Sequence, residues 1–556
     1  MPLPSERAPT KPLEQKLQEI NRISEEKEAI ATAKAMNLSY VDLAKLPINV
    51  DLLYILTEDE CRNALLIPFF RTGKKLRVAV ADAKNSETLL AIEKLKDMGY
   101  ALNINISSKS GILDSLKAYK VEFFKQKKEI ENVYTETDLG NMMAEIQNLA
   151  ELKEKMVTYS GEESANALLV GAMRAGASDI HIEPYDRITK VRFRIDGVLQ
   201  DVFEVRKEIS KNMINQFKHL GHIKLNITNR PQDGRFSFYV NKRKVDVRLS
   251  SLPSMFGESL VMRILASQQT LTKLEDLGLA GNALKLVQAG LNRPSGMMLS
   301  TGPTGSGKTT TLYAILHILN TTEDKIITLE DPVEYNVEGL VQSQVDPNIE
   351  YNFAAGLRSI LRQDPDVVMV GEIRDRETAE ISCQASLTGH IVLSTLHTND
   401  AISTIPRLVN MGLEPFVLAP ALDTVIAQRL VRRICLNCQE EYKYSDEEMK
   451  ILDDLIISLE KVQGITIDRP EHFLHAPGCE KCSHTGYKGQ LGIFEVFTVD
   501  RNLERMILER KLSADMFDYV RKTQKMLTLR EDGALRVLQG ITTLSEILRV
   551  TSDIES

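Results

Sequence analysis

The chain has 556 residues, of which 43% are hydrophobic and 26% are charged, and its formal net charge is −8. This length allows roughly three to four domains with ordinary apolar cores. The acidic balance argues against bulk nucleic-acid binding and leaves room only for a local basic patch. No stretch approaches the ~20 apolar residues of a membrane-spanning helix. Because residues 1–11 contain no apolar signal segment, we expect a cytoplasmic protein.

Residues 1–120 have the pattern of a small α/β module. Residues 26–36 and 86–97 have helical periodicity, and residues 76–81 alternate like a strand. Residues 121–160 are rich in charge and contain no proline, which predicts a helical or flexible linker between this module and the next domain.

A second domain is expected over residues 161–268. It opens with a helix, residues 163–175, that ends at Gly176. The pattern then alternates with period two, which is typical of half-buried strands and predicts a mainly antiparallel sheet. The clearest alternating runs are residues 180–183, 190–195 and 244–249.

Residues 269–556 alternate strands with helices, which predicts a parallel sheet covered by helices. Within this domain, residues 302–309 fit the phosphate-binding pattern G-x-x-x-x-G-K-[ST]. An apolar strand, residues 296–300, enters the loop, and a helix over residues 310–319 leaves it. This order makes a chance glycine-rich turn the weaker alternative. The residues expected to bind nucleotide here are Gly302, Pro303, Thr304, Gly305, Ser306, Gly307, Lys308, Thr309 and Thr310.

The side chains of this loop suit ATP and Mg²⁺. Glycine lets backbone N–H groups curl around the β- and γ-phosphates without a Cβ in the way. Lys308 can reach the phosphate oxygens, and the Thr309 hydroxyl can ligate Mg²⁺. The phosphates would then lie at the N-terminus of the helix that follows the loop.

Carboxylates follow two apolar strands of the same domain. Glu330, Asp331 and Glu334 come at the end of one strand, and Glu372 ends the strand over residues 366–371. Acids at the carboxyl ends of parallel strands can bind the nucleotide's Mg²⁺ or its waters, or orient the attacking water. Surface carboxylates without a role are the weaker alternative.

A third strand of this domain is bracketed by His390 and His397. The strand is expected beside the nucleotide, so that both histidines become candidates for contact with it and one of them for a γ-phosphate sensor. A pair of ordinary packing histidines agrees equally well with the spacing.

Two C-x-x-C pairs, Cys435/Cys438 and Cys479/Cys482, predict a Zn²⁺ site in a subdomain of about residues 434–495. Four thiolates leave no open position for water, so the site is expected to be structural. Chance pairs and a redox dithiol are the weaker alternatives, since a dithiol needs only one pair. The two remaining cysteines are expected to be packing residues.

These motifs together resemble the secretion ATPases of type IV pilus and type II secretion systems, over nearly the whole chain. Retraction motors of that family are shorter and usually lack both the cysteine pairs and the first module. The chain is therefore most similar to the assembly ATPases of the PilB kind or to their relative GspE. The matching segments are Ser178–His181 and Arg192–Gly197 in the second domain, Thr328–Tyr335 as the Asp box, Arg362–Asp375 as the Walker B region and Thr388–Asp400 as the His box.

The resemblance implies a RecA-like P-loop ATPase core, an α+β second domain of PAS-like fold, a small N-terminal α/β module and a zinc-binding subdomain. It also implies a homohexamer with ATP between subunits. Arg248 and Arg263 fall on the family's arginine positions, from which they would reach the γ-phosphate across a subunit boundary. Glu334 matches the water-orienting acid, Glu372 the Walker B glutamate and His397 the His box; which glutamate acts as the base stays open.

The function implied is an ATP-hydrolysing motor that powers pilin assembly through an inner-membrane platform protein, which holds it at the cytoplasmic face of the membrane. The alternatives are type II secretion, DNA uptake, a nucleic-acid translocase and a nucleotide-binding scaffold that does not hydrolyse. No direct nucleic-acid contact is expected, because aromatic and basic residues do not interleave in a stripe. The presence of Lys308, Glu334 and Glu372 argues against the scaffold.

Overall fold

The chain divides into two compact units, Met1–Val133 and Tyr134–Ser556, which are described separately. Residues 1–12 and 117–144, which include most of the expected linker, lie outside the described residues. The computed structural model describes residues 13–43, 52, 55–56, 58–72, 75–116, 145–156, 159, 161–240, 243–266, 273–334, 336–346, 349–470 and 472–554, and every structural statement below concerns these residues.

The first unit is the expected α/β module, with a four-stranded sheet of order β1-β4-β3-β2. Strand β4 pairs in parallel with β1 and β3, and β2 runs antiparallel to β3. The core is apolar, with Leu66, Leu76, Leu95 and Ile106 fully buried. The elements are α1 (Leu13–Ala35), β1 (Ser39–Tyr40), α2 (Glu58–Asn63), β2 (Leu66–Thr72), β3 (Lys75–Val80), α3 (Ser86–Asp97), β4 (Ala101–Ile106) and α4 (Lys109–Ser115).

The second unit begins with a region whose six-stranded sheet is antiparallel, in the order β7-β6-β5-β10-β9-β8. Buried and half-buried residues alternate along β6, because one face of the sheet is covered by helices. Phe193, Phe217 and Phe238 lie fully buried in this core. The elements are α7 (Leu149–Lys155), α8 (Gly161–Arg174), β5 (Ala177–Pro184), β6 (Ile188–Ile195), β7 (Val198–Arg206), α9 (Lys207–Leu220), β8 (Gln232–Val240), β9 (Arg243–Ser254) and β10 (Gly257–Ala266).

Helix α7 packs on this region, although the sequence placed residues 121–160 in a linker. Leu152 of α7 is fully buried, and a Cβ built on Gly171 of α8 would lie 2.3 Å from its Cδ2 atom. A Cβ at this position would displace the Leu152 side chain, so glycine favours this close packing of the two helices. We therefore propose that the second domain begins near residue 145 and not at residue 161.

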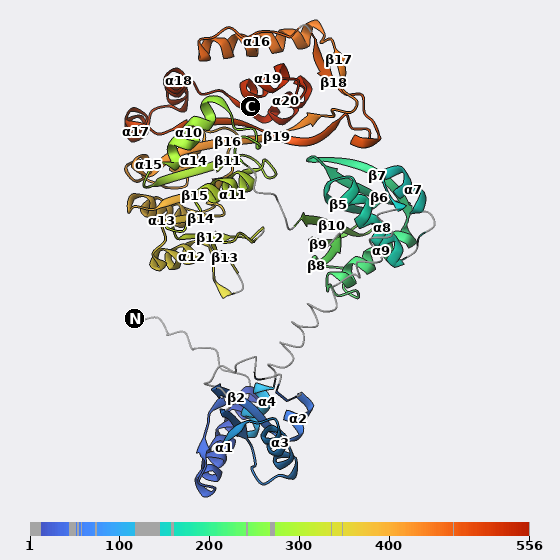
Figure 1. The fold of residues 1–556 in the computed structure, drawn as a ribbon, viewed down its shortest axis with the longest axis vertical. Coiled ribbons are helices and arrows are strands. Elements are labelled where there is room, and N and C mark those ends of the chain that lie inside the picture. Colours follow the sequence, from blue (N-terminus) through green and yellow to red (C-terminus); the bar gives the residue numbers. More distant parts are fainter. Residues whose placement is uncertain are drawn as a thin grey trace, which may run out of the picture. The chain divides into compact units, whose positions relative to one another are not determined.

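The rest of the second unit is built on a seven-stranded sheet of order β13-β12-β14-β15-β11-β16-β19, in which the pairing of β16 with β19 is antiparallel and the others are parallel (Figure 1). Helices cover both faces: Met297 and Leu299 of β11 pack in a core with α13, while Met298 packs in a core with α11. This arrangement confirms the expected parallel sheet. The elements are α10 (Gly281–Leu291), β11 (Gly296–Thr301), α11 (Lys308–Leu319), β12 (Ile326–Glu330), β13 (Val341–Gln344), α12 (Phe353–Ile360), β14 (Val367–Val370), α13 (Arg376–Leu387), β15 (Ile391–Leu396), α14 (Thr404–Asn410), α15 (Pro415–Ala421), β16 (Leu422–Ile434) and β19 (Tyr487–Thr498).

The C-terminal helices pack onto the edge of this sheet at β16 and β19. Helices α16, α19 and α20 share one apolar core with residues of β16 and β19, among them Val431 and Ile493. No described helix is both long and apolar enough to cross a membrane. The remaining elements are β17 (Glu440–Tyr442), α16 (Asp446–Gln463), β18 (Phe473–His475), α17 (Arg501–Leu508), α18 (Ser513–Gln524), α19 (Leu529–Leu538) and α20 (Leu544–Val550), with short 3₁₀ turns at Leu361–Gln363, Glu480–Cys482 and Ser552–Ile554.

Candidate active site and metal centre

The phosphate-binding loop lies between the carboxyl end of β11 and the N-terminus of α11. Two of its glycines are required by the close approach of β16 and have positive φ, +145° at Gly302 and +89° at Gly307. A Cβ on Gly302 would lie 2.5 Å from the carbonyl oxygen of Gln428, and one on Gly307 would lie 2.7 Å from its Nε2 atom. The loop is therefore held against β16 by contacts that other residue types would break.

Lys308 lies inside this loop with its residue only 8% exposed. Its Nζ donates to the carbonyl oxygens of Gly302 at 2.8 Å and Pro303 at 3.0 Å. Burial lowers the pKa of Lys308 to about 8, an effect that the charge of Glu372 opposes. The Oγ atom of Ser306 is buried without a hydrogen-bond partner, so the loop offers a donor, an ammonium group and helical N–H groups to an anion.

Glu372 lies directly after β14 at the same edge of the sheet. Its carboxylate forms a short ion pair with Arg374 and lies 3.6 Å from Nε2 of His397. The Glu372 side chain is 16% exposed, whereas Arg374 and His397 are more open. Burial and the nearby charge of Lys308 lower the pKa of His397 and favour its neutral form, an effect that the Glu372 carboxylate opposes. The structure thus brings Lys308, Glu372 and His397 together.

The Asp box contacts the second region within the same chain. Nη2 of Arg248 on β9 donates to the carbonyl oxygen of Val333 at 3.2 Å, and its Nη1 lies 4.0 Å from the Glu334 carboxylate. Arg263 pairs with Arg248 in the register of β9 and β10, and its Nε donates to Asp179 at 3.0 Å. Arg248 therefore reaches the Asp box of its own chain, and its expected contact with a nucleotide across a subunit boundary stays a prediction.

Two further predicted site residues, His390 and Glu330, lie at opposite ends of the strands. His390 precedes β15, whose first residue pairs with Gly296 at the start of β11, so about 20 Å of strand separates it from the edge that holds the loop. Glu330 is 3% exposed, and its carboxylate accepts hydrogen bonds from Tyr313 and Thr328, both at 2.6 Å. His390 therefore lies away from the phosphate-binding loop, whereas Glu330 ends β12 at the carboxyl end of the sheet with its carboxylate bound by Tyr313 of α11. Asp331 follows Glu330 and is exposed, and its negative charge is felt by Arg374.

Three residues near the site were not among the sequence candidates. Arg374 comes two residues after Glu372, so its charge in the Walker B segment was a visible signal. Gln428 accepts from Thr311 of α11 at 2.8 Å, and Arg429 comes next on β16. Nothing in the local pattern of β16 distinguishes these two polar residues from other residues of a strand, because their position depends on pairing with β11.

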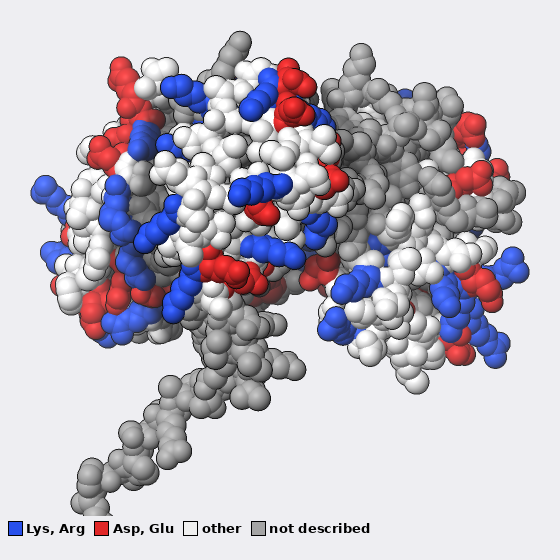
Figure 2. Space-filling model, turned by 90° about the horizontal axis from the view of Figure 1, so that it is seen from below, with Lys and Arg blue, Asp and Glu red and all other residues white. Residues whose placement is uncertain are grey.

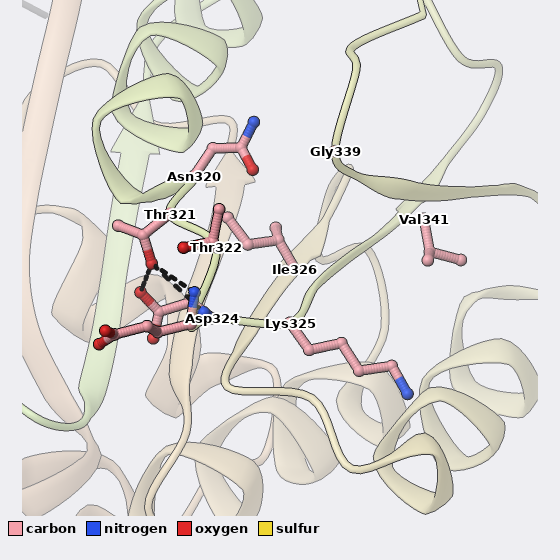
Figure 3. Close-up of a pocket in the computed structure, with 9 residues that line it drawn as sticks. Asn320, Thr321, Thr322, Asp324, Lys325, Ile326, Gly339 and Val341 are labelled. Carbon is pink, nitrogen blue, oxygen red and sulfur yellow. Dashed lines mark hydrogen bonds between the residues drawn. The ribbon is translucent and has the colours of Figure 1, made fainter.

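A cavity of about 580 Å³ lies at the amino ends of the strands of the seven-stranded sheet, opposite the end that carries the phosphate-binding loop (Figure 3). It is bordered by residues 320–326, Gly339 and Val341, where β12 and β13 begin. Its turn is held by a 2.7 Å hydrogen bond from Thr321 to Asp324. Because the phosphate-binding loop follows the carboxyl end of β11, this cavity is not part of the nucleotide site.

The four predicted ligand cysteines come together after β16 and before β19. Their Sγ atoms all lie within 4.8 Å of one another, with Cys435 and Cys479 3.9 Å apart, Cys438 and Cys482 3.9 Å apart, and Cys479 and Cys482 3.8 Å apart. A disulfide requires about 2.05 Å between sulfurs, whereas four thiolates at 2.3 Å from one tetrahedral ion are about 3.8 Å apart. The donor set therefore fits a metal ion.

Comparison with known proteins identifies the family. Residues 159–549 match the model described as type II/IV secretion system protein, and residues 36–119 match the MshEN domain. The chain belongs to the type II/IV secretion ATPase family. It is accordingly a P-loop ATPase, as the motifs predicted, with the RecA-like core that the resemblance implied.

The relatives include both branches named in the sequence analysis. The type II secretion system protein E of Pseudomonas aeruginosa is 46% identical over 388 residues, which are 70% of this chain and 75% of that protein. The type IV pilus assembly ATPase PilB of Myxococcus xanthus is 35% identical over 534 residues, which are 95% of this chain and 92% of that protein. The structure of the Legionella pneumophila ATPase DotB covers 71% of this chain and 96% of its own, with a TM-score of 0.51 and 20% identity, and shares the fold.

We expect the affinity of the protein for ADP to fall as the pH rises above about 8. The pKa of Lys308 is about 8, so its charged fraction, which pairs with phosphate, then falls about tenfold for each pH unit. Calorimetric titration with ADP from about pH 7 to 9.5, in buffers with different ionisation enthalpies, should detect proton uptake on binding above pH 8. The Lys308→Arg variant, whose side chain stays charged over this pH range, is the control and should show no such uptake. Equal proton uptake in both proteins would assign the titration to another group.

Proposed function

We propose that the protein is the motor ATPase of type IV pilus assembly, working in the cytoplasm at the inner membrane. The extent of similarity carries this proposal. PilB of M. xanthus aligns with 95% of this chain, an extent that includes the N-terminal module, whereas protein E of P. aeruginosa aligns with 70%. A type II secretion ATPase is the second candidate, because the identity within the shared region is higher, 46% against 35%.

The proposed chemistry begins at the phosphate-binding loop. The N–H groups at the start of α11 and the Lys308 ammonium group hold the β- and γ-phosphates of ATP. A Mg²⁺ ion bound by the Thr309 hydroxyl would neutralise phosphate charge. Glu372 orients the attacking water, and its contacts with Arg374 and His397 support this role by fixing the carboxylate. Glu334 is the second acid in reach of the same edge and the alternative base.

Arg248 is proposed to link hydrolysis to movement. It belongs to the antiparallel region but contacts Val333 and Glu334 of the Asp box, so it crosses from one part of the second unit to another. A cation beside the γ-phosphate stabilises the charge that develops on its oxygens. Phosphate release removes this attraction, and the two regions then separate. Arg263 is fixed by Asp179 and supports the position of Arg248 on the neighbouring strand.

The motor is proposed to act as a homohexamer on an inner-membrane platform protein. Cyclic movement of the two regions in six chains would turn or push that partner and add pilins to the fibre. On the face seen in Figure 2, Lys and Arg side chains are interspersed with Asp and Glu. Interspersed charge of this kind argues against a nucleic-acid partner, since nucleic-acid binding calls for a continuous basic surface.

The cysteine cluster is proposed to hold one structural Zn²⁺. All four ligand positions are thiolates, which leaves none for a reacting water. The side-chain amide of Asn437 donates to Cys479 at 3.4 Å, and the backbone N–H of Cys479 donates to Cys482 at 3.1 Å. These donors would share the negative charge of the thiolates, as neighbours of structural zinc sites do.

Neutralising Glu372 should stop turnover while nucleotide binding persists. The Glu372→Gln variant keeps the volume of the side chain but loses the charge that organises water and metal, so we expect kcat to fall about 100-fold or more with the Kd for ATP within a few-fold. Phosphate release and binding of a fluorescent ATP analogue measure the two quantities. Glu380→Gln on α13, an exposed acid paired with Arg376 of its own helix, is the control and should hydrolyse normally. If Glu372→Gln and Glu334→Gln both turn over at the wild-type rate, neither acid is catalytic.

Mixing two inactive variants should fail to restore activity. Arg248 contacts the Asp box of its own chain, so Arg248→Ala and Lys308→Ala each damage sites that the other variant cannot complete. We expect ATP hydrolysis in mixed rings to stay at the level of the separate variants. Mixing wild type with Lys308→Ala, followed by native mass spectrometry, checks that rings exchange subunits. Recovery of activity in mixed rings would place Arg248 in the neighbouring subunit's site.

The purified protein should contain about one zinc ion per chain. Cys438→Ser should lose the metal and lower the thermal stability of the C-terminal subdomain, while ADP binding at the distant loop is retained. Metal analysis by mass spectrometry and calorimetric unfolding measure these effects. Cys383→Ser removes a buried cysteine outside the cluster and serves as the control for metal content. Protein prepared without chelator and free of zinc would exclude the proposal.

Deleting the gene should remove surface pili and leave the secretion of folded exoproteins unchanged. A pull-down from native membranes with the Glu372→Gln variant, which should remain bound to ATP, is expected to recover an integral membrane protein encoded near pilin genes. The Lys308→Ala variant shows which captures depend on nucleotide. Loss of exoprotein secretion with normal piliation would favour the type II secretion candidate.

A further inference from the structure

The loop that follows His397 is tied to the end of the chain. The side-chain amide of Asn399 donates to the backbone carbonyl of Asp553 at 3.3 Å. Nη2 of Arg429 donates to the Asp553 carboxylate at 3.0 Å and to the backbone carbonyl of Asn399 at 3.4 Å. Arg429 of β16 therefore joins the loop of residues 398–401, called the His-box loop below, to the 3₁₀ turn Ser552–Ile554.

Arg429 lies close to the nucleotide site. It follows Gln428, the residue of β16 that touches the phosphate-binding loop, and its side chain is only 6% exposed. Its positive charge is one of the influences that lower the pKa of Lys308, after burial and against the opposing charge of Glu372. The Nε atom of Arg429 has no hydrogen-bond partner, and its Nη2 atom donates to the carboxylate of Asp553. Asp553 therefore provides the negative charge that balances this largely buried guanidinium group.

The same loop is fixed at two further points. The N–H of Thr398 donates to the Thr301 hydroxyl at 2.9 Å, at the end of β11, and the N–H of Ala401 donates to the buried carboxylate of Glu495 at 2.9 Å. The stretch between these anchors contains Asn399. The backbone carbonyl of Asn399 accepts from Arg429, and its side-chain amide donates to Asp553. The Arg429–Asp553 pair therefore holds the middle of the loop in place.

We propose that Asp553 is a positioning residue for ATP hydrolysis, which holds the His-box loop through Arg429 and Asn399 so that His397 stays beside Glu372. The match to the family model ends at residue 549, so this contact comes from a part of the chain beyond it. Without Asp553, the buried guanidinium lacks its carboxylate and turns to other acceptors, because an uncompensated buried charge is costly. A shift of about 1 Å in a catalytic side chain is enough to slow a reaction strongly.

The first test compares three variants of the full-length protein in a steady-state ATPase assay. Asp553→Ala should lower kcat about tenfold or more, with KM and the Kd for ADP within about twofold of wild type. Asp553→Glu, which keeps the charge, should recover most of kcat. Ser552→Ala is the matched control, since the Ser552 hydroxyl donates to the backbone carbonyl of Arg549 at 3.4 Å and not to Asn399 or Arg429. Unchanged kcat in Asp553→Ala, or loss of ADP binding together with kcat, would overturn the proposal.

The second test is a double-mutant cycle between Asp553→Ala and His397→Ala. If Asp553 acts by placing His397, its removal should have no further effect on kcat when the imidazole is absent. Losses that multiply, or a fully active His397→Ala enzyme, would contradict the proposal. The inference rests on the ATPase activity of the proposed motor but not on its cargo. An active enzyme that fails to support piliation would therefore count against pilus assembly alone.

Discussion

The contact between β16 and the phosphate-binding loop sets the geometry of the catalytic region. A Cβ on Gly302 would collide with the backbone carbonyl of Gln428, and one on Gly307 would displace the Gln428 side-chain amide. Because β16 is paired on both sides, with β11 and with β19, the loop is held against a strand that lies within the sheet. The preorganised donors of the loop can then face phosphate without rearrangement, which is the condition for strong electrostatic stabilisation.

The contact of Arg248 with the Asp box complements this rigidity. The pair of Arg248 and Glu334 is about one-third exposed on each side and 4.0 Å apart, so it contributes little to stability. An interaction of that strength can be made and broken during each cycle. A rigid loop and a weak contact between regions are together what a motor requires, since the chemistry needs fixed groups and the movement needs reversible ones.

The sequence predicted features that depend on neighbouring residues along the chain. The phosphate-binding loop, the acid after β14 and the cysteine pairs are contiguous motifs whose chemistry is visible in order. His390 could have been excluded, since a residue that precedes a strand lies at the edge opposite the loop. The burial of Glu330 against Tyr313 could not be predicted, because it depends on packing between β12 and α11. The docking of Leu152 on Gly171 and the partners of Arg429 also depend on contacts between distant segments.

The cysteine cluster has a consequence for the order in which the chain folds. Strands β16 and β19 are separated by residues 435–486, and their pairing must close this long loop before either strand gains a partner on that side. Cys435 follows the last residue of β16, and Cys482 precedes the start of β19 by a short turn. A metal ion captured by the four thiolates would bring the two strand ends together in advance. Nascent chains in metal-starved cells would then be slow to pair β19 with β16, the strand that contacts the phosphate-binding loop.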